Sequence, residues 1–515
     1  MSRINTNVAS QIAQRVLTTN KNSLNLSLER LSTGLRINRG KDDPAGLIAS
    51  ENLRAEKTAL GRAISNAERA DQVVNIAEGG LDEIGNLLNE VQGLVTETAN
   101  TAGLSSEERE ANQLKLDSIL QTIDRVASST NFQGTKLLNG NFDFSTTGVN
   151  AQVSSFKVNG AKIGFQGSLA VDVVVTGSAQ VGGYFLSFGA NNLNLTSANA
   201  RFVVEIAGAR GSRELSFASG TTLASVAAAV NSFTDVTGVK ARVSGTTGIR
   251  LFSDAYGSDQ FVSVKVSNAG GIDTGNLGIY NLNSGDADAV NTTRLGTFSS
   301  ASNAVKDLGQ DVRATVNGIA ATTKGTKLRI NTDFLDTEID LVYNTGASAA
   351  NAAKLGAVTA FTINGGGADF QLASRVNIAG KVSIGIGNVA VRDIGRTAST
   401  SGTATYFLSD LSAGKSLNLV NGDLTTAQKT VGKAITDLAA LRGRLGAFQQ
   451  NTVGATIRSL NVGLENTTAA ESVVRDADFA IETAGLTRSQ ILVSSATQIL
   501  GLANQQPQSA LQLLG

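Results

Sequence analysis

The sequence contains no cysteine, no histidine and no tryptophan among its 515 residues. Without cysteine and histidine the chain cannot form disulfides or thiolate and imidazole metal sites. It also cannot build a serine–histidine–aspartate triad or an HExxH zinc protease site. Only carboxylate, lysine, tyrosine, serine or cofactor chemistry remains. We therefore predict that the protein is not an enzyme and holds no metal and no cofactor.

Charge bias and long apolar runs are also missing. Lys+Arg and Asp+Glu both number 43, so no basic field for nucleic acid is present. No stretch approaches the ~18 continuous apolar residues of a membrane span, and the first ten residues lack the apolar core of a cleaved signal peptide. We expect no membrane insertion and, if the protein leaves the cell, another export route. Aromatic residues make up only 5%, so packing must depend on small and aliphatic side chains.

Apolar residues recur at helical spacing near both ends of the chain. Alternating steps of three and four residues predict coiled-coil helices, since a surface helix would drift from a strict seven-residue repeat. A third N-terminal helix is expected to start near Ser105, where a serine cap precedes acidic residues. The stripes comprise Leu17, Leu24, Leu28, Leu31 and Leu35; then Leu60, Ala63, Ala67, Ala70, Val74, Ala77, Leu81, Ile84, Leu88, Val91, Val95 and Thr98; then Leu424, Ala427, Val431, Ala434, Leu438, Leu441, Leu445, Phe448, Thr452 and Ala455; and finally Leu486, Ile491, Leu492, Ile499, Leu500 and Leu502.

The middle of the chain, from about 141 to 420, has a different pattern. Apolar and polar residues alternate in short runs, as in Arg201–Phe217 and Lys381–Asp393, and Gly, Asn, Asp and Thr separate the runs. This pattern is typical of β-structure with tight turns. One helix is expected within it, over Thr222–Phe233. The predicted fold class is therefore α+β.

The two helical ends are expected to pair with each other. An apolar seam left alone in water would be a long exposed stripe, which monomers avoid. The N- and C-terminal helices can cover one another if the chain leaves the bundle, builds the β-rich part and returns as an antiparallel hairpin. Charge agrees, because the first forty residues hold six basic side chains against one acid, whereas Glu465–Glu482 holds five acids against Arg475. Exposed ion pairs add only about 0 to 1 kcal/mol each, so burial must supply most of the stability.

A short non-helical joint is expected between the first two helices. Asp43 before Pro44 is typical of a helix N-cap followed by proline at the first helical position, and Gly34 allows the preceding helix to end. We interpret Asp42, Asp43 and Pro44 as a joint between two helical layers. Two alternatives stay open at this point: a surface turn inside one compact domain, and a cation site at the aspartates, which would need more oxygen ligands than are evident.

Several segments resemble the signatures of bacterial flagellins, in the order and spacing of that family. The resemblance covers roughly the first 140 and the last 95 residues, and a smaller insert motif of flagellins and hook-associated proteins follows from Thr222. The segments are "LSTGLRINRGKDDPAGLIAS" (31–50), "IDRVASSTNFQGTKLLNG" (123–140), "LRGRLGAFQQN" (441–451), "TTAAESVVRDADFAIETAGLTRSQIL" (467–492) and "LANQQPQSALQLL" (502–514).

The resemblance implies a subunit that polymerises into the helical flagellar filament and is exported through the flagellum's own channel. It implies an inner terminal layer of residues 1–45 with 456–515, a helical bundle layer of 46–180 with 375–455, and outer β-rich domains over 181–374, with the insert motif at about 200–268. Implied partners are further copies of the chain, a secretion chaperone at the C-terminal helices from about Thr467, the filament cap and the hook-junction proteins. The residues expected to form the assembly and coiled-coil core are Leu24, Leu28, Leu31, Leu35, Val74, Leu81, Leu88, Val95, Leu438, Leu445, Ile491, Leu492, Ile499 and Leu500, with Leu502 beside them.

The resemblance also bears on an animal Toll-like receptor that detects many flagellins. The recognised pattern has arginine where this chain has Glu90, and glutamate where it has Lys115. Because an arginine contact is not replaceable by a carboxylate, we expect weak receptor recognition.

Alternative functions stay open from the sequence. A hook–filament junction protein would share the terminal helices. A glycosidase-like carboxylate pair among Asp254, Asp259 and Asp273 would also be compatible with spacing, although these are ordinary turn residues. An adhesive role of the outer domains is the third alternative.

Overall fold

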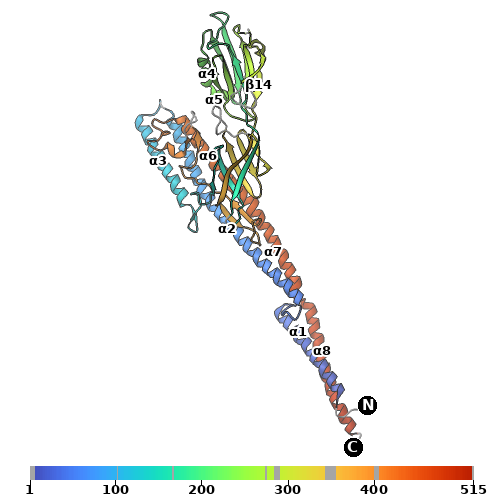
Figure 1. The fold of residues 1–515 in the computed structure, drawn as a ribbon. Helices are drawn as coiled ribbons and strands as arrows, with labels where there is room; N and C mark the ends of the chain where they lie inside the picture. The colour runs from blue at the N-terminus through green and yellow to red at the C-terminus, as the bar shows by residue number, and fades with distance from the viewer. Residues whose placement is uncertain are drawn as a thin grey trace. The chain divides into compact units, whose positions relative to one another are not determined.

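The computed structural model describes residues 6–100, 102–164, 167–272, 275–282, 290–342, 355–398 and 405–512. Figure 1 shows the helices and strands of the chain, which divides into two compact units. Unit 1 comprises Met1–Asn75, Phe370–Lys381 and Arg442–Gly515, and unit 2 comprises Ile76–Asp369 and Val382–Leu441. Long helices at both ends and β-sheets between them confirm the α+β prediction.

Unit 1 is built mainly from helices at the two ends of the chain. Helix α1 (Val8–Thr33) begins where the Asn7 side chain accepts the Ser10 N–H, and it ends at Gly34, whose φ of 71° is left-handed. Helix α2 (Pro44–Thr98) passes from unit 1 into unit 2. The C-terminal helices are α7 (Gly454–Arg475) and α8 (Phe479–Gln512). Helices α1 and α8 run antiparallel, since Asn7 contacts Ala503 at one end and Arg30 contacts Glu482 at the other.

The predicted stripe of α2 is confirmed as core. All twelve positions from Leu60 to Thr98 are buried, and none is more than 8% exposed. Alanine occupies four of these positions, which lets neighbouring helices approach closely, and valine, leucine and isoleucine fill most of the others. The seven-residue repeat therefore identified the buried face of this helix correctly.

Helices α3 (Ser106–Ser129) and α6 (Leu424–Ala447) begin in unit 2, which also contains the C-terminal part of α2. Helix α3 begins at the predicted serine cap, and Ser105 and Glu108 exchange side chain–backbone hydrogen bonds as a capping box. At the start of α6 the Asp423 carboxylate accepts the Thr426 hydroxyl at 2.6 Å and the Thr425 and Thr426 N–H groups. These hydrogen bonds, led by that of the Thr426 hydroxyl, lower the pKa of Asp423.

The stripe that begins in α6 leaves the core sooner than the sequence predicted. Phe448 is buried, but the last predicted member, Ala455, is exposed. Between them lies a π-helical turn, η4 (Phe448–Val453), which joins α6 to α7. A π turn adds about one residue to the helical repeat, so the buried position moves from Thr452 to Val453.

Two antiparallel sheets of unit 2 share one hydrophobic core that includes Val171, Val173, Leu328 and Phe361. One has the order β16-β15-β5-β20-β3 and the other β17-β18-β19-β4. Their strands are β3 (Phe144–Thr147), β4 (Val153–Ala161), β5 (Leu169–Gly177), β15 (Arg313–Val316), β16 (Ile319–Ala320), β17 (Thr322–Lys324), β18 (Lys327–Asn331), β19 (Leu335–Leu341) and β20 (Gly356–Gly366).

Two further sheets enclose a second core, in which the rings of Phe188, Phe202 and Phe298 pack on one another with centroids 5.0–5.4 Å apart. Their orders are β13-β12-β6-β10-β9 and β14-β11-β7-β8. Helix α4 (Leu223–Asn231), capped by Thr222, lies where the sequence predicted a helix. The other elements are β6 (Gly183–Ser187), β7 (Arg201–Gly208), β8 (Gly211–Ala218), α5 (Thr234–Thr237), β9 (Val239–Ser244), β10 (Gly248–Ser253), β11 (Phe261–Asn268), β12 (Gly278–Leu282), β13 (Val290–Gly296), η1 (Ser299–Ser302) and β14 (Val305–Leu308).

Short hairpins complete the structure. The predicted strand region Lys381–Asp393 forms a strand only over β22 (Lys381–Ile384); Ile386 makes a single antiparallel bridge to Phe142, and a turn follows from Val391. The remaining elements are β1 (Asn131–Phe132), β2 (Thr135–Lys136), β21 (Ala368–Gln371), β23 (Thr397–Ala398), β24 (Thr405–Tyr406) and η3 (Leu408–Leu411). In the described part of the chain, no helix combines the length and hydropathy that a membrane crossing requires.

Candidate self-assembly surface at the chain termini

Small side chains occupy the fully buried positions of the seam between α1 and α8. Ser10, Ala13 and Ser27 of α1 are buried, and so are Ser489, Ala496 and Ala503 of α8. Polar contacts fix the register: the Asn7 amide donates to the Ala503 carbonyl at 2.7 Å, and the Ser10 hydroxyl donates to the Asn504 side chain at 2.7 Å. Arg30 and Glu482 form the predicted kind of ion pair between the ends, at 2.9 Å. These contacts fix the register of the two helices, but burial of small side chains removes little apolar surface from water.

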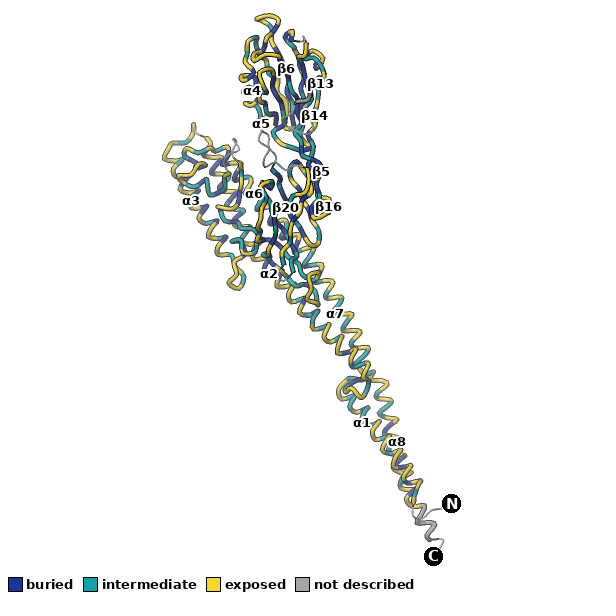
Figure 2. The backbone as a smooth tube through the Cα atoms, in the orientation of Figure 1, coloured by how far each residue is buried: buried dark blue, intermediate teal, exposed yellow. Residues whose placement is uncertain are grey.

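Large apolar side chains lie outside this seam. On α1, Val8, Ile12 and Val16 follow one another at four-residue steps and are 55%, 49% and 45% exposed. Exposed residues mark most of the α1–α8 pair in Figure 2. The pair thus carries an exposed apolar surface that no part of the described chain covers, and in soluble proteins such a surface marks an interaction site. We call it the terminal apolar surface; its members are Val8, Ile12, Val16 and Leu28 on α1 and Ile491, Leu492, Ile499 and Leu502 on α8.

The predicted core residues fall into two groups. Val74, Leu81, Leu88, Val95, Leu438 and Leu445 are buried within the chain. The terminal residues are not: Leu24, Leu31, Leu35 and Leu500 are half-buried, whereas Leu28, Ile491, Leu492 and Ile499 are exposed. Val8, Ile12 and Val16 were missed by the sequence analysis, although their i, i+4 spacing on one helix face is a usable signal.

Both aspartates of the predicted joint between α1 and α2 cap backbone groups. The Asp43 carboxylate accepts the Gly46 N–H at 2.9 Å, as an N-cap before Pro44 should. The Asp42 carboxylate accepts the N–H groups of Asn38 at 3.2 Å and Arg39 at 2.9 Å. The Arg39 hydrogen bond is the main reason why the pKa of Asp42 is lowered. Both aspartates are thus occupied by backbone donors, and the described residues contain no metal-ligand cluster.

The break between α1 and α2 is bonded to the break between α7 and α8. Leu35 and Asp476 form an antiparallel bridge, with the Arg36 N–H donating to the Arg475 carbonyl at 2.7 Å. The Ala477 N–H donates to the Gly34 carbonyl at 3.0 Å. Helix α8 then begins directly after Asp478, whose carboxylate accepts the N–H groups of Ala480 and Ile481 in the first turn of the helix. The helices at both ends of the chain are therefore interrupted at the same point of unit 1.

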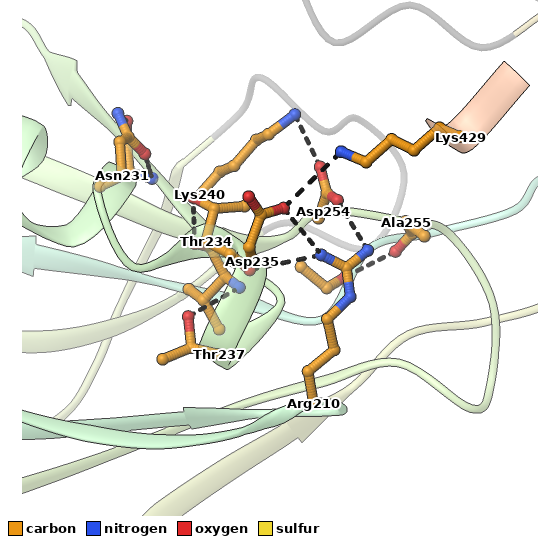
Figure 3. A network of polar contacts seen from close by, with 12 residues as sticks. Arg210, Asn231, Thr234, Asp235, Thr237, Lys240, Asp254, Ala255 and Lys429 are labelled. Atoms are coloured by element: carbon orange, nitrogen blue, oxygen red, sulfur yellow. Dashed lines mark hydrogen bonds and ion pairs between the residues drawn. The ribbon is translucent and has the colours of Figure 1, made fainter. Parts of the chain in front are cut away.

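Two of the three carboxylates considered for catalysis, Asp254 and Asp259, pair with cationic side chains. Asp254 is held between Arg210 at 3.2 Å and Lys240 at 2.6 Å, in a network that also brings Lys429 to Asp235 (Figure 3). Asp259 pairs with Lys324 at 3.0 Å. Asp273 lies outside the described residues. Cationic partners keep Asp254 and Asp259 in ordinary surface ion pairs.

Glu90 and Lys115 contact each other across α2 and α3. Their side chains lie 2.8 Å apart, and the hydrogen bond from Lys115 to Glu90 raises the pKa of Lys115. The two residues singled out in the sequence as charge-reversed are thus one ion pair, about half exposed, at 45% and 56%.

The described part of the chain thus combines paired terminal helices that carry an uncovered apolar surface with a buried helical stripe in α2 and β-sheet domains. Models of the bacterial flagellin N-terminal helical region, the C-terminal helical region and the flagellin hook IN motif match residues 4–143, 428–514 and 202–255. The chain belongs to the bacterial flagellin family. It is a structural subunit of the flagellar filament, which lies outside the cell.

Individual flagellins match this chain over nearly its whole length. Flagellin A of Helicobacter pylori is 25% identical over 541 residues and covers 99% of both chains. The B-type flagellin of Pseudomonas aeruginosa is 30% identical over 528 residues, again with 99% of both chains. Among solved structures, the D2–D3 domains of the Serratia marcescens flagellar cap protein match 40% of this chain and 99% of that chain, at 18% identity and a TM-score of 0.25.

Proposed function

We propose that copies of this chain join in the filament through the terminal apolar surface. The exposure of Ile491 (61%) and Ile499 (58%), large residues on a helix whose fully buried positions are small, is the observation that carries this proposal. In the assembled polymer, residues 1–45 with 456–515 form the inner layer, 46–180 with 375–455 the bundle layer, and 181–374 the outer domains. Asp42, Asp43 and Pro44 form the joint between the inner and bundle layers. The role is structural rather than catalytic.

The terminal helices complete their folding on assembly. A two-helix pair that fully buries only Ser and Ala, and leaves its leucines half-buried or exposed, buries too little apolar area to offset the entropy of ordering about 60 residues, at about 1 to 2 kcal/mol each. Neighbouring copies supply the missing contacts when they cover the terminal apolar surface. The same surface serves the secretion chaperone before assembly, since both partners need exposed apolar helix faces. The export route is the flagellar channel, and the cap and hook-junction proteins bind at the filament ends.

Charges placed on the terminal apolar surface are expected to stop assembly without unfolding the monomer. In the double variant Ile491→Lys/Ile499→Lys, the lysines stay hydrated in the monomer but would be buried between copies in the filament, which is strongly unfavourable. We expect an unchanged melting temperature by circular dichroism and at least a roughly tenfold higher critical concentration for filament growth by sedimentation. Chaperone binding should weaken in the same variant.

The matched control is Leu308→Lys, because Leu308 is equally exposed at 60% but lies on β14. It should assemble like the parent chain. Leu28→Ala, at 47% exposure, should likewise impair assembly more than monomer stability. Normal filaments from the double lysine variant would refute the proposal.

We propose weak recognition by the Toll-like receptor, because the Glu90–Lys115 pair presents charges of reversed sign. The double variant Glu90→Arg/Lys115→Glu restores the recognised signs while keeping an ion pair at the same place. In a receptor reporter assay with purified monomer, the parent chain should give little signal and the double variant a clearly larger one. A strong response to the parent chain would contradict this expectation.

A further inference from the structure

The outermost strands of one β-sheet in unit 2 are β8 and β14, which end the order β14-β11-β7-β8. An outermost strand leaves the backbone N–H and C=O groups on one side without partners in its sheet, so a further strand can add there. Strand β8 pairs with β7 from Gly211 to Ala218 without a bulge. Each of the three strand pairings in the sheet is antiparallel. The two outermost strands therefore run in opposite directions.

Both outermost strands carry an exposed charge on the same face of the sheet. Glu214 of β8 lies directly opposite Glu205 of β7, which in turn lies opposite Lys265 of β11. Lys306 of β14 lies opposite Ser263, two residues from Lys265, so its side chain shares that face. Glu214 and Lys306 are both exposed. The sheet thus presents a carboxylate at one edge and an ammonium group at the other.

Neither charge forms an ion pair with another described residue. The Glu214 carboxylate lies beside a second carboxylate, that of Glu205, and the Ser267 hydroxyl donates to it at 3.4 Å. Like charges directly opposite each other on neighbouring strands are destabilising. The Lys306 ammonium lies 4.0 Å from the centre of the Phe261 ring. A cation placed next to Glu214 and an anion placed next to Lys306 would therefore both be favourable.

We propose that β8 of one copy pairs with β14 of a neighbouring copy in the filament, so that their sheets join edge to edge. The inference rests on the proposed assembly through the chain ends, which brings copies side by side, and it adds a contact between outer β-domains. Two copies in the same orientation present strands of opposite direction at such an edge, as an antiparallel pair requires. A head-to-tail contact of this kind repeats along an open helical polymer without closing.

One register matches every charge of the two strands. Placing Glu214 opposite Lys306 of the neighbouring copy keeps both side chains on one face of the joined sheet. The same register sets Arg213 opposite Asp307 on the other face, because each is the next residue along its antiparallel strand. Two β8 strands cannot match in this way, since the face that carries Glu214 holds no cation on β8. The charges therefore favour β14 of a second copy over a second β8.

The absence of cysteine allows the contact to be trapped as a disulfide. In the proposed register Ser212 lies opposite Leu308 of the neighbouring copy, and both positions are exposed. Within one chain β8 and β14 are three strand spacings, or about 14 Å, apart, which is too far for a disulfide. Filaments grown from an equal mixture of Ser212→Cys and Leu308→Cys chains are oxidised with copper phenanthroline and run on a denaturing gel. We expect a dimer yield at least roughly tenfold above that of either variant alone.

Leu295→Cys is the matched control, because Leu295 is 47% exposed but lies on β13 of the other sheet. Its mixture with Ser212→Cys should give no more dimer than the single variants. The absence of dimer in filaments of the Ser212→Cys and Leu308→Cys mixture would overturn the inference. An equal yield from Ser212→Cys alone would overturn it as well, because β8 would then pair with β8.

Charge reversal in the same cysteine chains tests the register. Glu214→Lys in both chains should lower the dimer yield at least roughly fivefold, because two lysines would then face each other. Adding Lys306→Glu to both chains should restore the yield to within about twofold of the starting pair. An unchanged yield in the first case, or no recovery in the second, would contradict the proposed pairing. All these variants should still form filaments, because growth depends on the chain ends; filament formation, scored separately by electron microscopy, tests the terminal apolar surface.

Discussion

A chain that ends at Arg475 is expected to keep its bundle and β-domains but to form no filaments. Truncation removes α8, and with it half of the terminal apolar surface and the antiparallel partner of α1. The stripe of α2 and the two β-cores lie elsewhere in the chain and keep their partners. Electron microscopy should show no fibres at concentrations where the full chain polymerises, while circular dichroism should show a cooperative melt that persists.

Truncation from the other end gives the matching test. A chain that begins at Arg36 loses α1 but retains α2 from Pro44, and it should also fail to polymerise. Equal mixtures of either truncated chain with the full chain should still yield fibres of the full chain. Unaided fibres from either truncated chain would show that the ends are dispensable, and the terminal apolar surface would lose its proposed role.

Leu88→Ala is expected to destabilise the folded monomer by about 2 to 5 kcal/mol, because it removes a fully buried leucine from a rigid helical core. The matched variant is Leu114→Ala on α3, where the leucine is 71% exposed. Its expected loss is below about 0.5 kcal/mol, as for surface sites in general. Urea unfolding followed by circular dichroism measures both. A similar loss in the two variants would contradict the assignment of the α2 stripe as core.

The sequence predicted the helices at both ends well, for a physical reason. An alternation of three and four residues fixes which side chains share one face of a helix, and for Leu60 through Thr98 that face is buried at every position. Capping residues were equally informative, because Ser105, Asp43 and Thr222 each accept a backbone hydrogen bond where the sequence placed a helix start. The pairing of the sheets was beyond reach, since their partners are far apart along the chain, as for β5 and β20.

The candidate site was predicted less completely. Periodicity identifies a shared face but does not say whether that face is covered by the same chain or by another copy. Leu88 and Ile499 belong to similar stripes, yet one is 0% and the other 58% exposed. The seam between α1 and α8 was also missed, because Ser10 and Ser489 carry no hydrophobic signal although both are buried. The π turn at Phe448–Val453 had no recognisable sequence signature.

The bridge between Leu35 and Asp476 has a mechanical consequence. A single flexible linker would let the terminal helices rotate in any direction about the joint. Here two chain segments pass the joint side by side and are hydrogen-bonded to each other, so they restrict its motion mainly to bending about one axis. Bending about one axis remains easy, whereas twisting must strain both segments together. A rotary load applied at one end of such a polymer would thus pass through each subunit with little loss at this point.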